Sequence, residues 1–249
     1  MSASCASGAT PELSIIVPAW NEADGLPRTL DNLQRITAGT ARPCEIIVVD
    51  NASTDATPEI ARAHGARVVH EPERQISRAR NAGAAVARGR YLLFVDADTW
   101  PDAELLAETL RALDSGRICG GGAVVTFDDL HHAVYRAGAR AWNRLSRLLS
   151  LAAGCYIFCT REAFAGVGGF SERVYGGEEV WLSRAMRRWG RRHGQRFVVL
   201  DTPVQSSGRK AEWFGPLQQA LVVSQVLLLP WTLRSRRLCW FWYTRPKSK

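Results

Sequence analysis

The sequence lacks the patterns that mark disulfide-stabilised, zinc-binding or exported proteins. Its six cysteines include no C-x-x-C pair, and no histidine stands at zinc-finger spacing. Several cysteines lie in apolar stretches, where a free thiol behaves as a small hydrophobic side chain. Residues 1–11 are small and polar, without the basic start and apolar run of a signal peptide. These features predict a reduced, cytoplasmic protein with a flexible N-terminal tail over residues 1–11.

Internal repeats and low-complexity linkers are also missing from the sequence, so it does not indicate a second independent domain. With 249 residues, of which 46% are hydrophobic, the chain is long enough to bury a real core. Its formal net charge of +8 is the unusual feature of the composition. Such a charge predicts an anionic partner: nucleotide phosphates, nucleic acid or an acidic membrane face.

Strand and helix patterns alternate four times in the first hundred residues. Short apolar runs predict strands at 13–18, 44–49, 67–70 and 91–95, with helices between them at 24–36, 57–64 and 76–88. Apolar strands separated by helices predict an α/β fold, with a mostly parallel sheet and helices on both faces. The second half is less regular. We expect helices at 102–113, 131–151 and after 176–183, strands at 118–127, 153–160 and 197–200, and a flexible glycine turn at 164–170.

Acidic side chains follow three of these strands at the point where each strand ends. Asp96 and Asp98 come directly after the strand at 91–95, and Glu22 and Asp50 follow the first two strands. Residues two apart in an extended segment point the same way, so Asp96 and Asp98 can converge on one point. That edge of an open α/β sheet is where ligands bind. Two carboxylates there suit a divalent cation that carries phosphate oxygens; the alternative is a polar turn that caps the next helix.

Five segments then stand in a specific order: Ile15-Ile-Val-Pro-Ala-Trp-Asn-Glu22; Ile46-Ile-Val-Val-Asp50 with Ser53-Thr-Asp55; Arg78-Ala-Arg-Asn-Ala-Gly83; Ala87-Arg-Gly-Arg-Tyr-Leu-Leu-Phe-Val-Asp-Ala-Asp98; and Gly168-Gly-Phe170 with Glu178-Glu179. Together they resemble glycosyltransferase family 2, inverting nucleotide-sugar transferases of the GT-A fold. The resemblance covers about residues 13–200. It implies a GT-A domain at 12–210, with a nucleotide-binding half at 12–100 and an acceptor-binding half at 101–210.

The resemblance also implies residue roles. The nucleotide-sugar would be bound by Pro18, Ala19, Glu22, Asp50 and Asp96, and Mn2+ or Mg2+ by Asp96 and Asp98. Glu178 and Glu179 stand where the family usually has Glu-Asp, whose second member usually acts as general base. Glu179 is one methylene longer than that Asp, so the choice between the two stays open. A third metal ligand is not identifiable; the candidates are His193, Asp201 and Ser206.

The chemistry of such a site can be stated from the residue types. A divalent cation stabilises the charge that develops on a departing diphosphate. A carboxylate on the opposite side removes the proton of the acceptor hydroxyl, and an unperturbed Glu, with a pKa of about 4.3, is ionised at neutral pH. The alternative for Glu178-Glu179 is a helix start, where acids favour the helix dipole. Among donors, the family resemblance favours a UDP-sugar over a GDP-sugar.

Residues 211–249 carry a different pattern. Apolar runs broken by Gln and Ser predict an amphipathic helix at 216–233, too short and too polar to span a membrane. Arg and Lys mixed with Trp240-Phe-Trp-Tyr243 follow, and membrane interfaces favour this combination. The alternative is a helix packed on the catalytic domain with a basic tail. Peripheral contact with the inner face of an anionic membrane would suit a lipid-linked acceptor.

Three other functions stay open at this stage. A non-catalytic nucleotide-sugar binding protein would share the same residues. A sugar-phosphate nucleotidyltransferase would have a Gly-rich loop with Lys and Arg after its first strand, whereas the loop at 19–24 is acidic. A nucleic-acid binder agrees with the net charge, but the acidic strand ends and the absence of a binding motif argue against nucleic acid as a partner.

Overall fold

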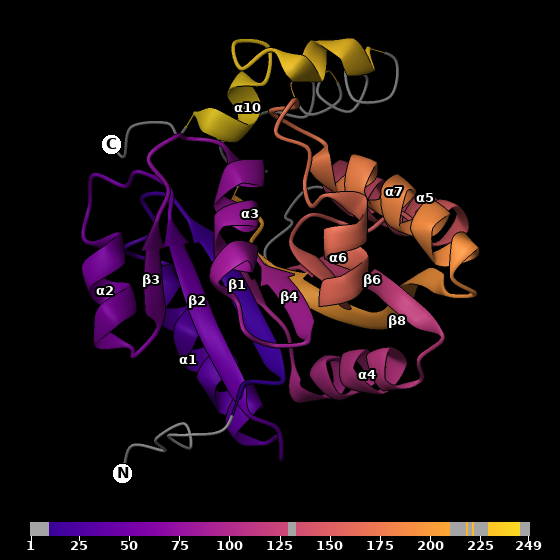
Figure 1. Cartoon of the computed structure of the whole chain (residues 1–249). Helices are drawn as coiled ribbons and strands as arrows, with labels where there is room; N and C mark the ends of the chain where they lie inside the picture. The colour runs from indigo at the N-terminus through magenta and orange to yellow at the C-terminus, as the bar shows by residue number, and fades with distance from the viewer. Residues whose placement is uncertain (1–9, 129–132, 210–217, 219–220, 222–228, 245–249) are drawn as a thin grey trace.

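The structure is a computed structural model that describes residues 10–128, 133–209, 218, 221 and 229–244. One eight-stranded sheet runs through it in the order β3-β2-β1-β4-β7-β6-β8-β5 (Figure 1). The strands are β1 (Leu13–Ala19), β2 (Cys44–Asp50), β3 (Arg67–His70), β4 (Tyr91–Val95), β5 (Thr99–Trp100), β6 (Ile118–Phe127), β7 (Tyr156–Thr160) and β8 (Arg196–Ser206). The helices are α1 (Leu26–Ala38), α2 (Thr57–Ala63), α3 (Ile76–Val86), α4 (Ala103–Asp114), α5 (Ala133–Leu149), α6 (Arg161–Val167), α7 (Glu178–Arg192), the 3-10 helix η1 (Pro230–Arg234) and α10 (Trp240–Tyr243).

The sheet is parallel in its first half and mixed in its second. β1 pairs in parallel with β2 and β4, and β2 with β3, as the alternating pattern predicts. β7 lies antiparallel between β4 and β6. Parallel neighbours require a crossover over the sheet, and antiparallel neighbours do not. The chain between β6 and β7 passes through α5 without such a crossover, and β7 pairs antiparallel with β6.

Helices cover both faces of the sheet, which confirms the predicted α/β architecture. On one face, α1 and α4 bury Leu30 and Leu106 against the strands. On the other face, α3, α6 and α7 cover a second cluster that includes Phe94 and Met186. The Phe94 ring meets the Phe170 ring edge-on at a centroid distance of 5.0 Å. Each such buried side chain contributes about 1.5–3 kcal/mol relative to an exposed one, so the two clusters fix the strand ends that carry the acids.

The glycine turn predicted at 164–170 is wrong for most of its length. Residues 161–167 form α6, because the Thr160 hydroxyl accepts a hydrogen bond from the Ala163 N–H at 3.1 Å and so caps the helix. The predicted turn is confirmed at its end, where Gly168 and Gly169 have φ of 78° and 71°. The strand predicted at 197–200 is also longer, because the second part of β8 pairs with β6 and β5.

The C-terminal segment lies over the sheet edge at which the acids gather (Figure 1, yellow). The Tyr175 N–H donates to the Leu233 carbonyl at 2.7 Å, and Leu233 and Cys239 are buried. The amphipathic helix predicted at 216–233 lies mostly outside the described residues. Among the helices that are described, none has the length and apolar character needed to span a membrane. The described tail therefore packs on the domain, while Trp231 keeps 63% of its surface exposed.

Candidate active site

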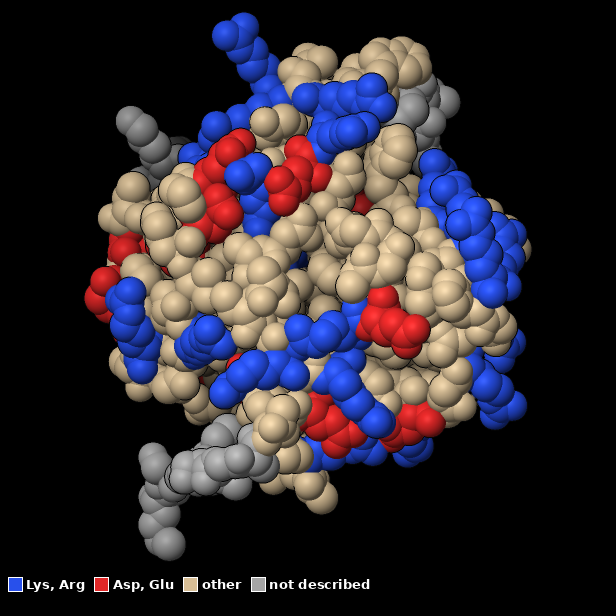
Figure 2. Space-filling model, viewed as in Figure 1, with Lys and Arg blue, Asp and Glu red and all other residues tan. Residues whose placement is uncertain are grey.

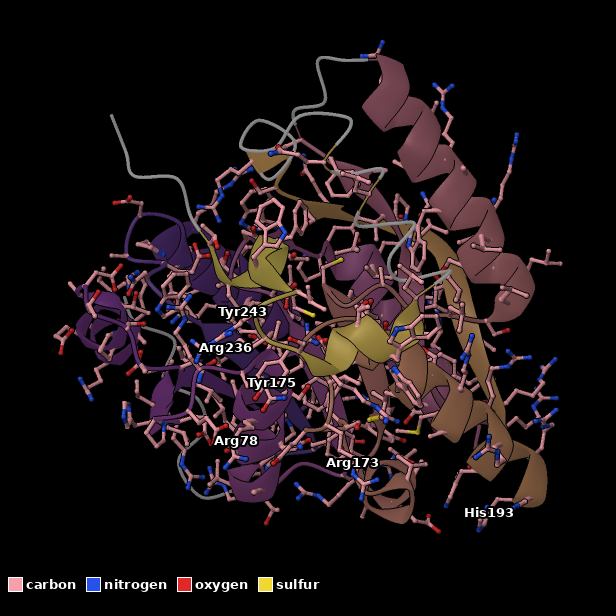
Figure 3. All side chains as sticks on the ribbon, turned by 90° about the horizontal axis from the view of Figure 1, so that it is seen from above. Arg78, Arg173, Tyr175, His193, Arg236 and Tyr243 are labelled. Atoms are coloured by element: carbon pink, nitrogen blue, oxygen red, sulfur yellow. The ribbon has the colours of Figure 1, made fainter. Side chains whose placement is uncertain are left out.

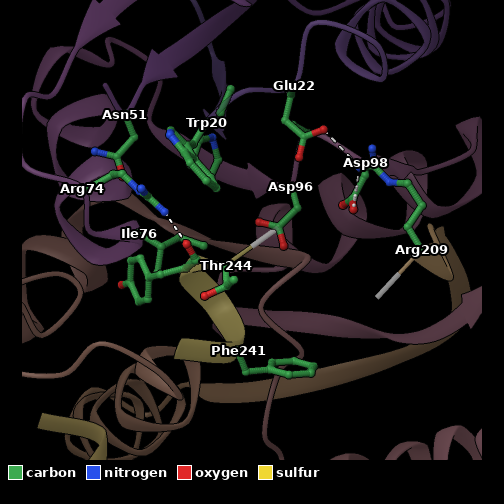
Figure 4. A pocket seen from close by; sticks show the side chains of 14 residues that line it. Trp20, Glu22, Asn51, Arg74, Ile76, Asp96, Asp98, Arg209, Phe241 and Thr244 are labelled. Atoms are coloured by element: carbon green, nitrogen blue, oxygen red, sulfur yellow. Dashed lines mark hydrogen bonds and ion pairs between the residues drawn. The ribbon is translucent and has the colours of Figure 1, made fainter. Parts of the chain in front are cut away.

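A pocket opens between the carboxyl ends of the first strands and the C-terminal segment (Figure 4). Its lining residues are Pro18, Ala19, Trp20, Glu22, Asn51, Arg74, Ile76, Asp96, Ala97, Asp98, Arg209, Phe241, Tyr243 and Thr244. Five residues predicted to bind donor or metal are among them: Pro18, Ala19, Glu22, Asp96 and Asp98. Asp50, Glu178 and Glu179 were also predicted to belong to the site and are not among the lining residues.

The loop after β1 is held in place by the turn after β2. Asn21 has a φ of 52°, a left-handed value that Asn tolerates better than most residues. Its side-chain oxygen accepts a hydrogen bond from the Thr54 N–H at 2.8 Å, and the Glu22 N–H donates to the Thr57 hydroxyl at 2.8 Å. The turn at 53–55 therefore orients the loop that carries Glu22 into the pocket.

Asp50 supports this turn from the end of β2. Its buried carboxylate accepts hydrogen bonds from the Ser53 N–H at 3.0 Å and pairs with His70 Nδ1 at 2.9 Å. The next residue, Asn51, lines the pocket, and its amide donates to backbone carbonyls at 3.1 and 2.7 Å. The structure thus gives Asp50 a positioning place and puts Asn51 at the pocket wall. The role of Asp50 in nucleotide binding stays a prediction.

Asp96 and Asp98 lie in the turn between β4 and β5. The Thr99 hydroxyl is 2.9 Å from the Ser206 hydroxyl, and the Ser207 N–H donates to the Asp98 carbonyl at 2.9 Å. This pairing brings the chain after β8 to the turn. Arg209 Nη2 then donates to Asp98 at 3.1 Å and to Glu22 at 3.0 Å. The sequence does not indicate Arg209, because the pairing of β8 with β5 and β6 is what brings it to the acids.

Arg80 of α3 connects the pocket with the acids of α7. Its side chain is 1% exposed; Nη2 donates to Asp96 at 2.8 Å and to a backbone carbonyl at 2.7 Å, and Nη1 donates to Glu178 at 2.6 Å. Gly83 allows α3 to come this close, since a Cβ there would lie 2.4 Å from the Ile16 side chain. The sequence marks Arg80 only as part of the Arg-Asn-Ala-Gly stretch and does not show its two partners.

Glu178 and Glu179 begin α7, directly after Gly177 with its φ of 68°. Glu178 is 4% exposed and ion-paired with Arg80, whereas Glu179 is partly exposed. Burial of its carboxyl group and the negative charge of Glu178 raise the pKa of Glu179 to about 8. The expectation of an ordinary, ionised Glu is therefore corrected: at neutral pH most of Glu179 is protonated in the ligand-free protein.

Asp96 and Asp98 provide a donor set that fits Mg2+ or Mn2+, because Mg2+ is usually held by one or two carboxylates together with substrate phosphate oxygens and water. The described residues contain no group of three or more His, Cys, Asp or Glu placed to hold an ion. The fit therefore requires oxygens from the substrate and water.

The three candidates for a further metal ligand lie in different surroundings. Ser206 is beside the Asp96–Asp98 turn, where its hydroxyl pairs with Thr99. His193 stacks on Trp189 near the end of α7, with ring centroids 3.8 Å apart, and Asp201 pairs with Arg147 at 2.8 Å. Neither His193 nor Asp201 lines the pocket. Ser206 is the one candidate that the fold brings to the acids.

Aromatic and cationic side chains form the wall opposite the acids. The Arg74 guanidinium lies 3.5 Å from the centroid of the Trp20 ring and donates to the Tyr243 carbonyl. The Tyr243 ring meets Tyr175 edge-on at 6.1 Å, and the Arg236 guanidinium lies 5.6 Å from it (Figure 3). The C-terminal segment thus supplies part of the pocket wall, a role that the sequence interpretation of the tail did not include.

Replacing Arg80 by Met should destabilise the protein by about 3–5 kcal/mol, because the buried Glu178 and the partly exposed Asp96 would lose their counter-charge. Urea unfolding would measure this loss. Arg90→Met is the matched control, since Arg90 also pairs with two acids, at 3.0 and 3.3 Å, but is 61% exposed. Exposed pairs contribute about 0–1 kcal/mol. Equal losses in the two variants would contradict the proposed importance of the buried pair.

The raised pKa of Glu179 predicts a pH-dependent stability. Between the ordinary value of 4.5 and about 8, the folded protein holds the Glu179 proton while the unfolded chain has released it. Stability should therefore fall as pH rises through this window and level off above it. We expect the melting temperature of wild type to fall relative to Glu179→Gln between pH 5 and 8. The exposed Glu104→Gln variant should show no such trend, and a pH-independent difference for Glu179→Gln would refute the assignment.

Comparison with known proteins is consistent with this geometry. The family model described as glycosyl transferase family 2 matches residues 14–167. The putative glycosyltransferase EpsH of Bacillus subtilis is 30% identical over 166 residues, which cover 55% of this chain and 47% of EpsH. The dolichyl-phosphate beta-glucosyltransferase of Drosophila melanogaster is 42% identical over 120 residues, which cover 41% of this chain and 36% of that protein. The matched part is thus less than half the length of either relative.

A solved structure shows the same fold. Mannosyltransferase PcManGT from Pyrobaculum calidifontis, in complex with GDP-Man and Mn2+, aligns with a TM-score of 0.64 and 24% identity. The alignment covers 82% of this chain and 60% of that one. The GT-A fold predicted from the sequence is confirmed by this likeness. Because the family model spans more than half of the chain, the protein belongs to glycosyltransferase family 2.

Proposed function

We propose that this protein is an inverting, metal-dependent glycosyltransferase that moves a sugar from a nucleotide-diphosphate donor to an acceptor hydroxyl. The arrangement around Arg80 carries this conclusion. Arg80 joins Asp96, at the pocket, to Glu178, which precedes Glu179 at the start of α7. A donor diphosphate would lie on the Asp96 side and the acceptor hydroxyl on the Glu179 side, so the anomeric carbon would be between them.

The pocket wall supports a nucleotide-diphosphate as the donor. The flat ring of Trp20, backed by Arg74, offers a stacking surface for a base, and Pro18 and Ala19 continue that wall. Arg209 supplies a positive charge at the opposite end, beside Asp98. We propose a UDP-sugar as the first choice and a GDP-sugar as the second; PcManGT, which shares the fold, was solved with GDP-Man.

Asp96 and Asp98 would hold Mn2+ or Mg2+ together with the donor phosphates. When bound, the cation stabilises the negative charge on the leaving diphosphate. In this structure Arg80 pairs with Asp96, and Arg209 pairs with both Asp98 and Glu22. These ion pairs hold the acids turned toward one another in spite of their mutual repulsion. Arg209 is 31% exposed, so its side chain has room to turn toward a bound diphosphate.

Glu179 is our choice for the general base. The carboxylate of Glu178 is already bound to Arg80, whereas Glu179 is partly exposed. A pKa raised to about 8 makes the ionised form of Glu179 a stronger base, and the ionised form is the one that would accept the proton. In the transfer, the acceptor oxygen bonds to the anomeric carbon and the bond from that carbon to the phosphate oxygen breaks. Its electron pair leaves with the diphosphate and the hydroxyl proton passes to Glu179, with inversion at the carbon.

We further propose that the acceptor is lipid-linked and that the protein works on the cytoplasmic side of an anionic membrane, as a peripheral protein. The described tail supports this placement, because Trp231, Leu238 and Trp240 are 63%, 50% and 40% exposed beside exposed arginines. Trp and Arg together favour a membrane interface. The name of one relative, the dolichyl-phosphate beta-glucosyltransferase, also refers to a lipid phosphate.

The donor proposal predicts metal-dependent thermal stabilisation. Purified protein would be melted with UDP-, GDP- and dTDP-sugars, each with and without Mn2+, beside the Asp96→Ala, Asp98→Ala variant. A ligand at a hundredfold excess over its dissociation constant raises stability by about 2.7 kcal/mol, which is a shift of several degrees. We expect one nucleotide to give this shift only with metal, and the variant to lose it. Because that variant also releases Arg80 and Arg209 from their partners, its fold is checked by circular dichroism.

Three results would contradict the proposed function, once a sugar-transfer assay and a melt with nucleoside triphosphate and sugar phosphate are added to this experiment. Stabilisation without sugar transfer, even with varied acceptors, would indicate a non-catalytic nucleotide-sugar binding protein. Stabilisation by nucleoside triphosphate and sugar phosphate would indicate a nucleotidyltransferase, although Glu22 in the loop after β1 would repel a triphosphate. If no nucleotide stabilises a well-folded protein, the chain shares the fold of these enzymes but not their binding of a nucleotide-sugar.

The tail proposal predicts binding to phospholipid vesicles. Exchange of both Trp231 and Trp240 for Ser should lower flotation with vesicles several-fold, because two interfacial side chains are lost. Phe127→Ser is the control, since this ring is 38% exposed but lies at the end of β6. Flotation that is the same for the double variant and wild type would count against contact through the tail.

A further inference from the structure

Helix α5 leaves most of its length in solvent. From residue 136 to its end, Ser146 is the single buried side chain. Its arginines recur at spacings of three or four residues and so form one row: Arg136, Arg140, Arg144 and Arg147. Leu148 beside this row is 80% exposed, and Leu149 is 40% exposed. The helix therefore presents a basic row with apolar side chains at one end.

Helix α7 has the same character on its outer side. After its two N-terminal acids, its charged residues are all basic: Arg184, Arg187, Arg188, Arg191 and Arg192. Trp181 is 39% exposed and lies three residues before Arg184, which places both on one side. Leu182 and Met186 face the core instead. The outer side of α7 thus combines exposed arginines with an exposed aromatic ring.

The two rows join into one surface, called here the α5–α7 surface. Arg187 Nη1 donates to the Leu149 carbonyl at 2.5 Å, which ties the end of α5 to the middle of α7. Residues 133–161 and 180–200 contain no Asp or Glu. One ion pair on this surface joins Arg147 to Asp201, whose side chain is 80% exposed. Figure 2 shows Lys and Arg gathered along the right-hand edge, where Figure 1 places α5 and α7.

We propose that the α5–α7 surface docks on an anionic phospholipid membrane. Its arginines would lie among acidic headgroups, and Leu148, Leu149 and Trp181 would reach the boundary of the acyl chains. The residues named for this surface do not line the donor pocket, and they belong to elements other than the described part of the tail. The proposal therefore goes beyond the sugar-transfer reaction and does not depend on the identity of donor or acceptor.

The exposed apolar side chains favour a membrane over other anionic partners. A nucleic-acid backbone would neutralise the arginines, but it would leave Leu148 and Leu149 in water. A surface that is merely solvated explains the arginines, but not the position of three exposed apolar side chains among them. An anionic bilayer satisfies both, because charge and apolar area are buried in the same contact.

The test uses the full chain and two variants that each lose four positive charges. The test variant is Arg140→Gln, Arg144→Gln, Arg184→Gln and Arg188→Gln. The control variant is Arg35→Gln, Arg62→Gln, Arg111→Gln and Arg117→Gln, whose residues are also exposed but lie outside the α5–α7 surface. Flotation is measured with vesicles of phosphatidylcholine alone and of phosphatidylcholine with phosphatidylglycerol, at low and high salt.

We expect wild type to float with the anionic vesicles, less so at high salt, and hardly at all with the neutral ones. The test variant should bind at least about tenfold more weakly, and the control variant within about twofold of wild type. Leu148→Asp should weaken binding as well, and its 80% exposure makes a folding defect unexpected. A circular dichroism spectrum and a melting temperature equal to those of wild type would show that the test variant is intact.

Two results would overturn the proposal. If both charge variants lose binding equally, the net charge of the protein and not the α5–α7 surface is responsible. If wild type binds RNA or heparin but not the anionic vesicles, the surface serves a soluble polyanion. Flotation of the Trp231→Ser, Trp240→Ser variant separates this surface from the tail, since contact through α5 and α7 would persist in it.

Discussion

The ion pairs of Arg80 are the contact on which the site depends. A guanidinium that is 1% exposed is costly unless most of its donors are bound; here two carboxylates and a carbonyl accept from Nη1 and Nη2, while Nε has no acceptor among the described residues. Asp96 and Glu178 are 82 positions apart in the sequence, yet one side chain fixes both. Replacing one partner would leave a buried charge uncompensated, which is far costlier than losing an exposed pair. The end of β4 and the start of α7 are thereby held as one rigid unit.

Arg209 forms an ion pair with Asp98, as Arg80 does with Asp96, but Arg209 lies at the surface of the pocket. Three carboxylates within one pocket repel one another strongly where water is partly excluded. The two arginines remove this repulsion in different ways, since Arg80 is buried while Arg209 is 31% exposed. The ion pairs of Arg209 are therefore closer to solvent than those of Arg80. A divalent cation would then compete with Arg209 for Asp98, and leave Arg80 in place.

The sequence predicts the parts of this architecture that have a local signature. Apolar runs mark β1 to β4, and the acids that follow them reach the same edge, because parallel strands end together. Arg80 and Arg209 carry no such mark, since their partners are distant and are brought near only by α3 packing on β1 and by β5 pairing with β8. The error at α6 has a similar cause: three glycines suggested a turn, and the Thr160 cap outweighed them. The place of the tail over the pocket depends on contacts between Tyr175 and Leu233 that no periodicity reveals.

Glu178 and Glu179 lie in the first turn of α7, and this position is compatible with the acid–base role that we propose for Glu179. The helix dipole at the N-terminus of α7 favours ionised carboxylates by about 0.3–1 kcal/mol, which is less than one pKa unit. Burial and the neighbouring charge of Glu178 act in the opposite direction and are larger, since the pKa of Glu179 rises from 4.5 to about 8. Arg80 forms an ion pair with Glu178, so the Glu178 carboxylate is already occupied. The second acid is left with a proton affinity suited to an exchange with a hydroxyl group.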